Sequence, residues 1–481
     1  MKRAPVTDLV VFLPGIMGTR LADADGAAIW DLSGGALWRA LRTFGKSVKG
    51  LRLPADTGDD HPGDGVRPVG VMPDLHAIPG IWHPVDGYTD LLGFLEQNFT
   101  LRRRLPNDPP GTAANLVEFG YDWRLSCRYN AHRLRKRVAE ELERWRSSAP
   151  ERADAQVVFL CHSMGGLVAR HYVECLRGYE TTRRLITLGT PHRGSLDALV
   201  HLVNGLRKGW GLFGVDLTGF ARSLPSLHQL APDYACVSTA DGHELAYARD
   251  LTGLPGPDTK LLEDAARFHA ELRQAAEAPG RDARTDLVAV VGVRQPTATT
   301  GVYAGGLLVP AWDIAGVDEG GDGTVPRLSA RPANAAGTGS LTATAFTPNE
   351  QHGSLQNNRG VRDAIWGWLG QEPPFHRGPE DEDVPPLSVL APSLLEHGVP
   401  YEVRVSVPGD VEGHDELLVV AELKPAGRRD GASRSLRNLG GGRYQGSFPA
   451  PEGGAYRLAV RVEGRAESTV TALTLVGESG E

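Results

Sequence analysis

The sequence predicts an α/β fold, a doubly wound and mostly parallel β-sheet, followed by a small antiparallel β-sandwich. Over roughly the first 370 residues, short apolar runs alternate with segments of helical periodicity, which is typical of parallel strands joined by right-handed crossovers. From about residue 395, alternating apolar and polar residues are separated by Gly, Asp and Pro turns at about ten-residue spacing. That pattern is typical of a small antiparallel sandwich.

Five short and mostly apolar segments predict the strands of the parallel sheet, because strands covered on both faces carry little polar alternation. They are 9–13, 116–119, 157–160, 184–188 and 287–293. Apolar residues at helical spacing predict the helices of the same domain. They are 88–97, 130–145, 166–177 and 361–370.

Two stretches interrupt this alternation and predict insertions that cap the sheet. The first, near 25–85, is dense in Gly, Pro and Asp, and the second, near 195–280, mixes helix and loop. Loops of this length are often functional. Crowded Pro, Glu and Asp then indicate a linker. The predicted organisation is a first domain over 1–376, a linker over 377–394 and an Ig-like sandwich over 395–481.

The charge and the cysteine pattern exclude several classes of function. A formal net charge of −8 argues against nucleic acid as a partner, because phosphate binding needs a basic surface. The basic run LRRRL at 101–105 is a solvated surface by this interpretation. The four cysteines show neither metal spacing nor a disulfide framework. Free thiols fit a reducing compartment, and the apolar stretch 9–13 is too short for a signal peptide or a membrane span, so we expect a cytoplasmic protein.

A polar pair between an apolar run and two glycines is the first sign of chemistry. Residues 157–170 read VVFLCHSMGGLVAR, a strand that turns at Ser163 directly into a helix. This fits a nucleophile elbow, where small flanking residues allow a strained turn that presents the hydroxyl above the sheet. Cys161 stands where the G-x-S-x-G pattern has its first glycine. Cysteine is small, so we expect the turn to form with some added crowding.

A serine nucleophile needs a base and a carboxylate that orients the base. The chain order in this fold is Ser, then Asp or Glu, then His. Asp322 lies in the turn GDGTVP, and His352 lies in the polar loop EQHGSL before the last predicted helix of the domain. We therefore predict Ser163 as the nucleophile, His352 as the general base and Asp322 as the residue that holds the imidazole.

Other side chains remain as alternatives at this point. His192, in TPHRGS, follows a strand and is a rival base. His162 adjoins Ser163, but neighbouring side chains in such a turn point apart. Asp313 and Asp318 are rival carboxylates. An ordinary strand–helix turn, a turn aspartate and a surface histidine would explain the same three residues without any chemistry.

The tetrahedral intermediate of acyl transfer needs two backbone N–H donors. One is expected at Met164, directly after the nucleophile, and the other in a loop after an early strand. The loop PGIMG at 14–18 offers Ile16, and its glycines allow a close approach of the backbone. A phosphate site is the other interpretation of such a loop, but the Lys-Ser/Thr ending and the G-x-G-x-x-G spacing are missing. We predict Ile16 and Met164 as oxyanion donors, with no metal and no organic cofactor.

Taken together, these segments resemble the lecithin:cholesterol acyltransferase family of α/β-hydrolases. The stretch FGYDWRLS at 119–126 is the most specific part of the resemblance, which covers roughly residues 7–370. The matching segments are VFLPGIMGTRL, FGYDWRLS, LCHSMGGLVAR, LGTPHRGS, GDGTVP and QHGSLQNN.

The resemblance implies that the residues predicted above occupy the triad and oxyanion positions of the family. It also implies a buried carboxylate–guanidinium pair between Asp122 and Arg124, beside the site. Members of the family transfer or hydrolyse acyl chains of phospholipids and related lipids. The secreted members carry a signal peptide and a disulfide-closed lid, and neither is evident here. The first cap region is rebuilt around three tryptophans, Trp30, Trp38 and Trp82.

The sequence therefore predicts a serine O-acyltransferase, lipase or esterase that acts on acyl esters, lipid esters foremost, through an acyl-enzyme. One alternative is a lipase or thioesterase that acts on soluble acyl esters. Another is a non-catalytic interaction protein whose sandwich binds a partner. The apolar segment GWGLFG at 209–214 suggests either transient contact with a membrane surface or packing in the core.

Overall fold

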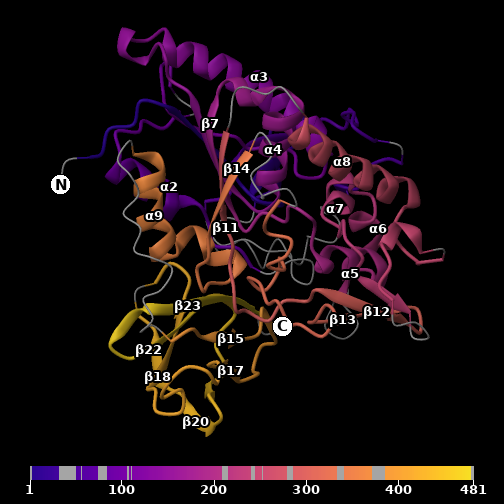
Figure 1. Ribbon diagram of the computed structural model, residues 1–481, viewed down its shortest axis with the longest axis vertical. Coiled ribbons are helices and arrows are strands. Elements are labelled where there is room, and N and C mark those ends of the chain that lie inside the picture. Colours follow the sequence, from indigo (N-terminus) through magenta and orange to yellow (C-terminus); the bar gives the residue numbers. More distant parts are fainter. Residues whose placement is uncertain are drawn as a thin grey trace.

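A six-stranded parallel sheet forms the centre of the first domain (Figure 1). The strand order is β14-β11-β7-β6-β1-β5, and every neighbouring pair is parallel. The strands are β1 (Leu9–Leu13), β5 (Leu116–Glu118), β6 (Val157–His162), β7 (Thr182–Leu188), β11 (Thr285–Val290) and β14 (Leu341–Phe346). The predicted α/β class is thereby confirmed.

The computed structural model describes most of the chain. The described residues are 3–31, 50–55, 57–73, 84–105, 108–109, 111–208, 215–239, 244–251, 253–278, 285–332, 341–370, 385–428 and 430–477. Segment 209–214, considered above for membrane contact, and the tryptophans at 38 and 82 lie outside them.

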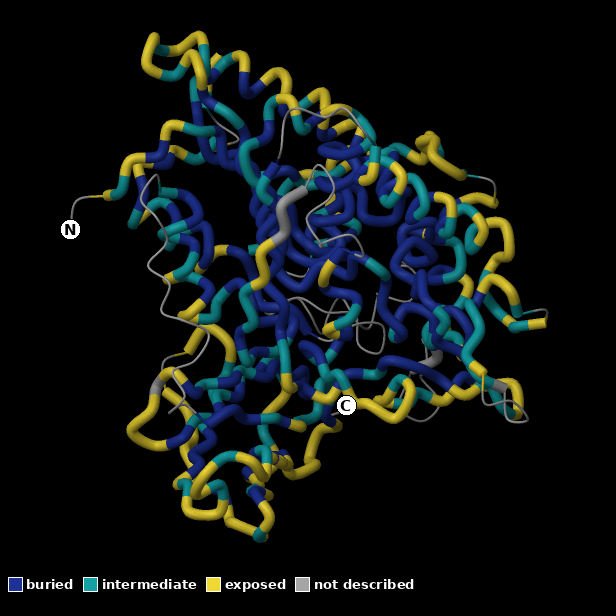
Figure 2. The backbone as a smooth tube through the Cα atoms, viewed as in Figure 1, coloured by how far each residue is buried: buried dark blue, intermediate teal, exposed yellow. Residues whose placement is uncertain are grey.

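The central strands are apolar because both of their faces are covered. In β1, Leu9, Val11 and Leu13 pack into one buried cluster, whereas Val10 and Phe12 pack into a second cluster on the opposite face. Alternate side chains of a strand point to opposite faces, so a strand buried on both sides needs apolar residues at every position. Figure 2 shows this buried layer in dark blue through the middle of the domain.

Helices cover the two faces of the sheet. One cluster joins the sheet to α3 (Cys127–Arg146), α4 (Met164–Cys175) and α8 (Thr259–Glu277). The other joins it to α2 (Thr89–Asn98) and α9 (Arg359–Leu369). The sheet is therefore the middle layer of three.

Two of the differences from the sequence-based expectation have a clear physical cause. Helix α3 begins three residues before the predicted start, because the Ser126 side chain accepts a hydrogen bond from the Arg128 N–H (3.1 Å) and caps the helix at that point. Strand β14 was not expected at all. It is an edge strand of the sheet, and its Thr344 and Ala345 are exposed, so it lacks the apolar run that identifies the central strands.

The described parts of the two expected insertions contain regular structure. A small antiparallel sheet that begins just before the first insertion consists of β2 (Thr19–Ala22), β3 (Ala28–Trp30) and β4 (Arg67–Val71). We expected irregular structure at β4, whose Pro and Gly obscure the strand pattern. The second insertion contains α5 (Leu196–Asn204), β8 (Arg207–Lys208), β9 (Val215–Asp216), α6 (Thr218–Ala221), α7 (Pro225–Gln229), β10 (Val237–Thr239) and α8. Strand β10 pairs with the hairpin of β12 (Thr300–Ala304) and β13 (Leu307–Ala311).

The C-terminal part forms two sheets around a buried cluster of its own (Figure 1). One sheet has the order β15-β17-β21-β20 and the other β16-β23-β22-β18-β19. The strands are β15 (Ser388–Leu390), β16 (Leu394–Leu395), β17 (Tyr401–Ser406), β18 (Val419–Pro425), β19 (Ala432–Ser435), β20 (Arg437–Gly440), β21 (Arg443–Phe448), β22 (Gly454–Val462) and β23 (Arg465–Val476).

Strands β15 and β16 fall inside the range 377–394 that the composition assigns to a linker, or at its end. Both are too short to show a clear alternation of apolar and polar residues. They pair with β17 and β23, so ordered structure resumes before residue 395.

Candidate active site

Ser163 lies at a sharp turn between β6, which ends at His162, and α4, which begins at Met164. Its φ of 51° and ψ of −126° are unusual for a residue with a Cβ, and such backbone conformations cost about 1–3 kcal/mol. The Ser163 N–H donates to the Leu188 carbonyl oxygen (2.9 Å), which holds the turn against β7. The turn is therefore a nucleophile elbow in its geometry.

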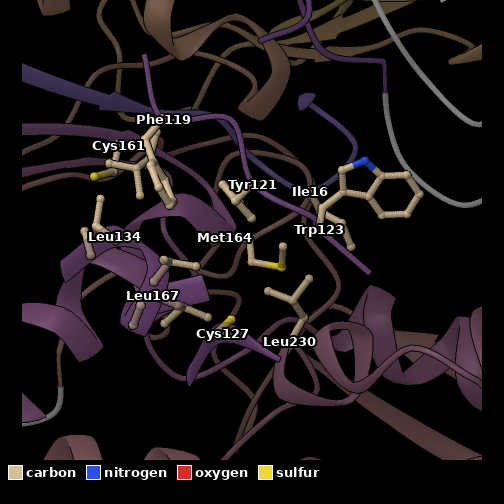
Figure 3. Packing of buried hydrophobic residues seen from close by; sticks show 14 of the residues in the cluster. Ile16, Phe119, Tyr121, Trp123, Cys127, Leu134, Cys161, Met164, Leu167 and Leu230 are labelled. Atoms are coloured by element: carbon tan, nitrogen blue, oxygen red, sulfur yellow. The ribbon is translucent and has the colours of Figure 1, made fainter. Parts of the chain in front are cut away.

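Close packing explains the glycines around this turn. A Cβ on Gly165 would lie 2.5 Å from the Pro14 carbonyl oxygen, and a Cβ on Gly166 would lie 2.1 Å from Thr190 Oγ1. Real Cβ atoms do not approach other atoms so closely, so both positions require glycine. Position 161 does not require glycine, because the Cys161 side chain packs in the hydrophobic cluster that also holds Met164 (Figure 3).

The structure brings Ser163, His352 and Asp322 together. His352 Nε2 lies 3.0 Å from Ser163 Oγ, and His352 Nδ1 lies 2.7 Å from Asp322 Oδ2. A carboxylate oxygen can only accept, so Nδ1 carries the proton and Nε2 can accept from the serine hydroxyl. All three residues are at most 2% exposed. The three therefore form a continuous chain of hydrogen bonds in a buried setting.

Backbone contacts fix the carboxylate and the imidazole. Asp322 Oδ1 accepts from the N–H groups of Thr324 (3.0 Å) and Val325 (2.7 Å). The His352 N–H donates to the Asp322 carbonyl oxygen (2.7 Å). Gly189 leaves room for this pair, because a Cβ there would lie 2.8 Å from Asp322 Oδ2. The turn GDGTV therefore orients Asp322 Oδ2 toward the imidazole of His352.

The rival side chains have other contacts. His192 Nε2 lies 3.3 Å from Thr187 Oγ1, and burial lowers the pKa of His192 well below its ordinary value. Asp313 Oδ2 accepts from the Gly316 N–H, and Asp318 Oδ1 accepts from the Gly320 N–H. Each rival carboxylate therefore caps a turn of its own loop.

The loop that carries Ile16 lies against the elbow. A Cβ on Gly15 would be 3.0 Å from Ser163 Cβ, so the backbone of this loop passes directly beside Ser163. Met164 follows Ser163 as the first residue of α4. Ile16 and Met164 are both buried and belong to one hydrophobic cluster (Figure 3).

A second hydrogen-bond network, which the sequence did not reveal, links the same segments. The Gly15 N–H donates to the Tyr88 hydroxyl (3.0 Å), and this hydroxyl lies 3.0 Å from His162 Nδ1. His162 Nε2 lies 3.0 Å from the His352 carbonyl oxygen. A carbonyl only accepts, so Nε2 carries the proton and Nδ1 can accept from Tyr88. His162 therefore links the elbow to the His352 loop and, through Tyr88, to the Ile16 loop. No sequence signal pointed to Tyr88.

Asp197 is a further residue that the sequence analysis did not single out. It lies in the first turn of α5 and is partly buried. Burial raises the pKa of its carboxyl to about 7; the charge of Asp322 adds to this shift and His352 opposes it. The protonation of the Asp197 carboxyl therefore depends on the charges of Asp322 and His352.

The buried pair expected at Asp122 and Arg124 is present. Arg124 Nε donates to Asp122 Oδ1 (3.0 Å), and one of its terminal nitrogens donates to Asp122 Oδ2 (2.7 Å). The neighbouring aromatic residues hold the Ile16 loop: the Tyr121 hydroxyl donates to the Pro14 carbonyl oxygen (2.8 Å), and Trp123 Nε1 donates to the Thr19 carbonyl oxygen (3.2 Å). The side chains of the YDWR segment therefore support the Ile16 loop by donating hydrogen bonds to backbone carbonyl oxygens at both of its ends.

Within the described part of the chain, no helix is long and apolar enough to span a bilayer. Nor do three or more His, Cys, Asp or Glu side chains there gather as a metal site requires. Cys127, Cys161 and Cys236 are buried and form no disulfide bond.

Residues 111–250 match the family model described as lecithin:cholesterol acyltransferase. The match spans less than a third of the chain and includes the YDWR segment and the elbow. No curated protein matches the chain.

Two solved structures are similar to most of the chain at low identity. The Bacillus licheniformis lipase BlEst2 in its propeptide form shares 12% identity at a TM-score of 0.33, covering 98% of this chain and 73% of that chain. The mature form of the same lipase also shares 12% identity at a TM-score of 0.33, covering 77% of this chain and 95% of that chain. At this TM-score the likeness supports no conclusion about this chain.

Proposed function

We propose that this α/β-hydrolase, which resembles lecithin:cholesterol acyltransferase, cleaves acyl esters through a covalent acyl-enzyme on Ser163. The observation that carries the proposal is the pair of hydrogen bonds at His352, with Ser163 Oγ at 3.0 Å and Asp322 Oδ2 at 2.7 Å. A base within hydrogen-bond reach of a nucleophile, itself oriented by a carboxylate, is the arrangement that nucleophilic acyl transfer needs.

In the first half-reaction, Ser163 Oγ attacks the ester carbonyl while His352 Nε2 takes the hydroxyl proton. Asp322 keeps the Nδ1 proton in place and stabilises the imidazolium. The backbone N–H groups of Ile16 and Met164 bind the oxyanion of the tetrahedral intermediate. His352 then returns the proton to the leaving alcohol, and the acyl group stays on Ser163.

In the second half-reaction, water or an acceptor alcohol attacks the acyl carbon while His352 Nε2 removes its proton. The bond between the acyl carbon and Ser163 Oγ then breaks, and His352 returns the proton to Ser163 Oγ. Water gives hydrolysis, and an alcohol gives O-acyl transfer. The family match over residues 111–250 supports acyl esters as substrates, with acyl lipids as the first class to test.

Steady-state turnover of p-nitrophenyl esters of several chain lengths tests the proposal. We expect turnover by the wild type and by Ser147→Ala, a control at an exposed serine, and a loss of at least about 10³-fold in Ser163→Ala. Phospholipids, triacylglycerols and short esters, each with and without an alcohol acceptor, then distinguish hydrolysis from transfer. Equal turnover by Ser163→Ala and the wild type would refute the proposal.

A further inference from the structure

The loop that carries His352 is bonded to the C-terminal sandwich. Glu350, two residues before the base, is 2% exposed. Its Oε1 accepts from the backbone N–H of Thr471 in β23 (2.7 Å) and from the Gln351 N–H (2.9 Å). Its Oε2 accepts from the Asn358 side chain (3.2 Å). One buried carboxyl therefore joins the sandwich, the base loop and the N-cap of α9.

The first strand of the sandwich makes a second attachment to this loop. Gln351 Nε2 donates to the Val389 carbonyl oxygen (3.1 Å), and Asn349 Nδ2 donates to the Leu387 carbonyl oxygen (3.0 Å). Gln295 bonds the same two residues, with Nε2 donating to the Leu387 carbonyl oxygen (3.0 Å) and Oε1 accepting from the Val389 N–H (3.1 Å). The residues immediately before His352 are thus held by β15.

A third attachment reaches the other side of the base loop. Arg457, in β22, donates to the Asp86 carboxylate. The same carboxylate accepts from Asn357 Nδ2 (2.7 Å), and the Asp86 N–H donates to the Gly353 carbonyl oxygen (2.8 Å). Asp86 therefore connects Arg457 to both ends of the short helix η6 (His352–Asn357).

Apolar packing shows that these bonds belong to an extended contact. In β23, Val470, Ala472 and Val476 face the core of the sandwich, whereas Leu473 and Leu475 join the hydrophobic cluster of the first domain. A strand with apolar residues on both faces is buried on both sides. Figure 1 shows β23 at the side of the sandwich that is nearest to the first domain.

We propose that the sandwich is part of the catalytic apparatus, with Glu350 and Arg457 as positioning residues that hold the His352 loop in register with Ser163. The inference rests on the proposed function, because it concerns the same base. Neither residue reaches the Ser163 hydroxyl; both act through the backbone of the loop. A displacement of the base by about 1 Å is enough to reduce a rate by about 10²-fold.

Four full-length variants test the inference. Glu350→Ala removes all three bonds of the carboxyl. Glu350→Gln keeps an oxygen for the N–H groups of Thr471 and Gln351. Arg457→Met keeps the apolar stem and removes the bond to Asp86. Glu402→Gln is the matched control, because Glu402 lies on the exposed face of β17, where its carboxylate pairs with the exposed Arg404.

The readouts are kcat and KM for a p-nitrophenyl ester, with active sites counted by end-point fluorophosphonate labelling. Hydrogen exchange of the 349–358 amides is measured alongside. Glu350→Ala should lower kcat per labelled site at least tenfold, with KM within about twofold and faster exchange in 349–358. Arg457→Met should lower kcat severalfold. Glu350→Gln should recover most of the loss, and Glu402→Gln should match the wild type.

Unchanged kcat per labelled site in both Glu350→Ala and Arg457→Met would overturn the inference, whatever happens to thermal stability. Faster exchange without a change in kcat would also overturn it, because the sandwich would then support the fold alone. If Ser163-dependent turnover is found and these variants are unaffected, only this inference fails. If the wild type turns over no ester, the proposed function fails and this inference falls with it.

Discussion

His162 Nε2 lies 3.0 Å from the backbone carbonyl oxygen of His352, so the residue before the proposed nucleophile is hydrogen-bonded to the proposed base. The imidazole of His162 is also bonded to Tyr88, whose hydroxyl accepts from the Gly15 N–H. The elbow, the base loop and the Ile16 loop therefore share one hydrogen-bond network.

Removing this network should slow catalysis without unfolding the protein. His162→Phe keeps an aromatic ring against Tyr88 and His352 but loses both hydrogen bonds. We expect kcat to fall about 5- to 30-fold, because each of the two lost hydrogen bonds contributes about 1 kcal/mol, with KM within about twofold. Steady-state kinetics with a p-nitrophenyl ester measures both. Tyr172→Phe, which removes a hydroxyl bonded to Thr181 at the far end of α4, is the control and should keep wild-type kcat.

Gly15 should not tolerate a side chain. A Cβ there would lie 3.0 Å from Ser163 Cβ and 3.1 Å from His162 Nδ1. Gly15→Ala should lower kcat at least tenfold and reduce the free energy of unfolding by about 1–3 kcal/mol, as overpacking does. Denaturant unfolding and ester turnover provide the two values.

Gly93→Ala is the matched control for that substitution. Gly93 lies in α2, and its added Cβ would meet only Gln97 Nε2, at 3.9 Å. We expect unchanged kcat and a gain of about 0.5–1 kcal/mol in stability. An active Gly15→Ala enzyme would contradict the close approach of the loop to Ser163.

Asp322→Asn should be among the most damaging substitutions that keep the shape of the site. The N–H groups of Thr324 and Val325 point at Oδ1, so the new amide would place its NH₂ toward His352 Nδ1. Nδ1 would then accept, and the proton would move to Nε2, where it blocks transfer from Ser163. We expect kcat to fall about 10³- to 10⁴-fold.

The rival carboxylates provide the controls for this prediction. In Asp313→Asn and Asp318→Asn the amide oxygen can still accept from the N–H groups of Gly316 and Gly320, which the carboxylates bind now. Both variants should stay within about twofold of the wild-type kcat. A larger loss of kcat in either of them than in Asp322→Asn would contradict the assignment of Asp322 as the carboxylate that orients His352.

Asp197 should make both stability and activity depend on pH. Its folded pKa is raised from 3.8 to about 7. The extra stability is therefore fully present below about pH 4 and is lost as the pH rises through 7. Burial also raises the pKa of Glu350 to about 7, so Glu350 changes the stability with pH in the same direction. The difference in stability between the wild type and Asp197→Asn therefore isolates the contribution of Asp197.

Denaturant unfolding of the wild type and Asp197→Asn from pH 4 to pH 8 measures this contribution, and the variant should show the flatter profile. The ionised carboxyl also stabilises the imidazolium of His352. Ester turnover by the two proteins over the same pH range should therefore differ most above pH 7, where Asp197 is ionised. Parallel stability profiles in the two proteins would show that Asp197 is not linked to folding.

The elements that could be predicted from the sequence are those with a strong local pattern. Strands β1 and β6 are apolar at nearly every position because they are buried on both faces. The glycines after Ser163 show that its turn has no room for side chains. Asp322 and His352 followed from the chain order and from their polar loops, and the structure brings both to Ser163.

The features that could not be predicted depend on contacts between distant segments. Tyr88 and His162 are 74 residues apart, and nothing in either local sequence indicates that they meet. The bond between Glu350 and Thr471 joins the two domains across 121 residues. Strand β14 lies at an edge of the sheet, where Thr344 and Ala345 are exposed, so its composition resembles that of a loop.

The rate at which a fluorophosphonate labels the protein, with the adduct mapped by peptide mass spectrometry, tests the central claim most directly. Our account predicts one adduct, on Ser163, and a labelling rate at least about 10³-fold lower in folded His352→Ala. An adduct on another residue, or labelling of His352→Ala at the wild-type rate, would contradict it.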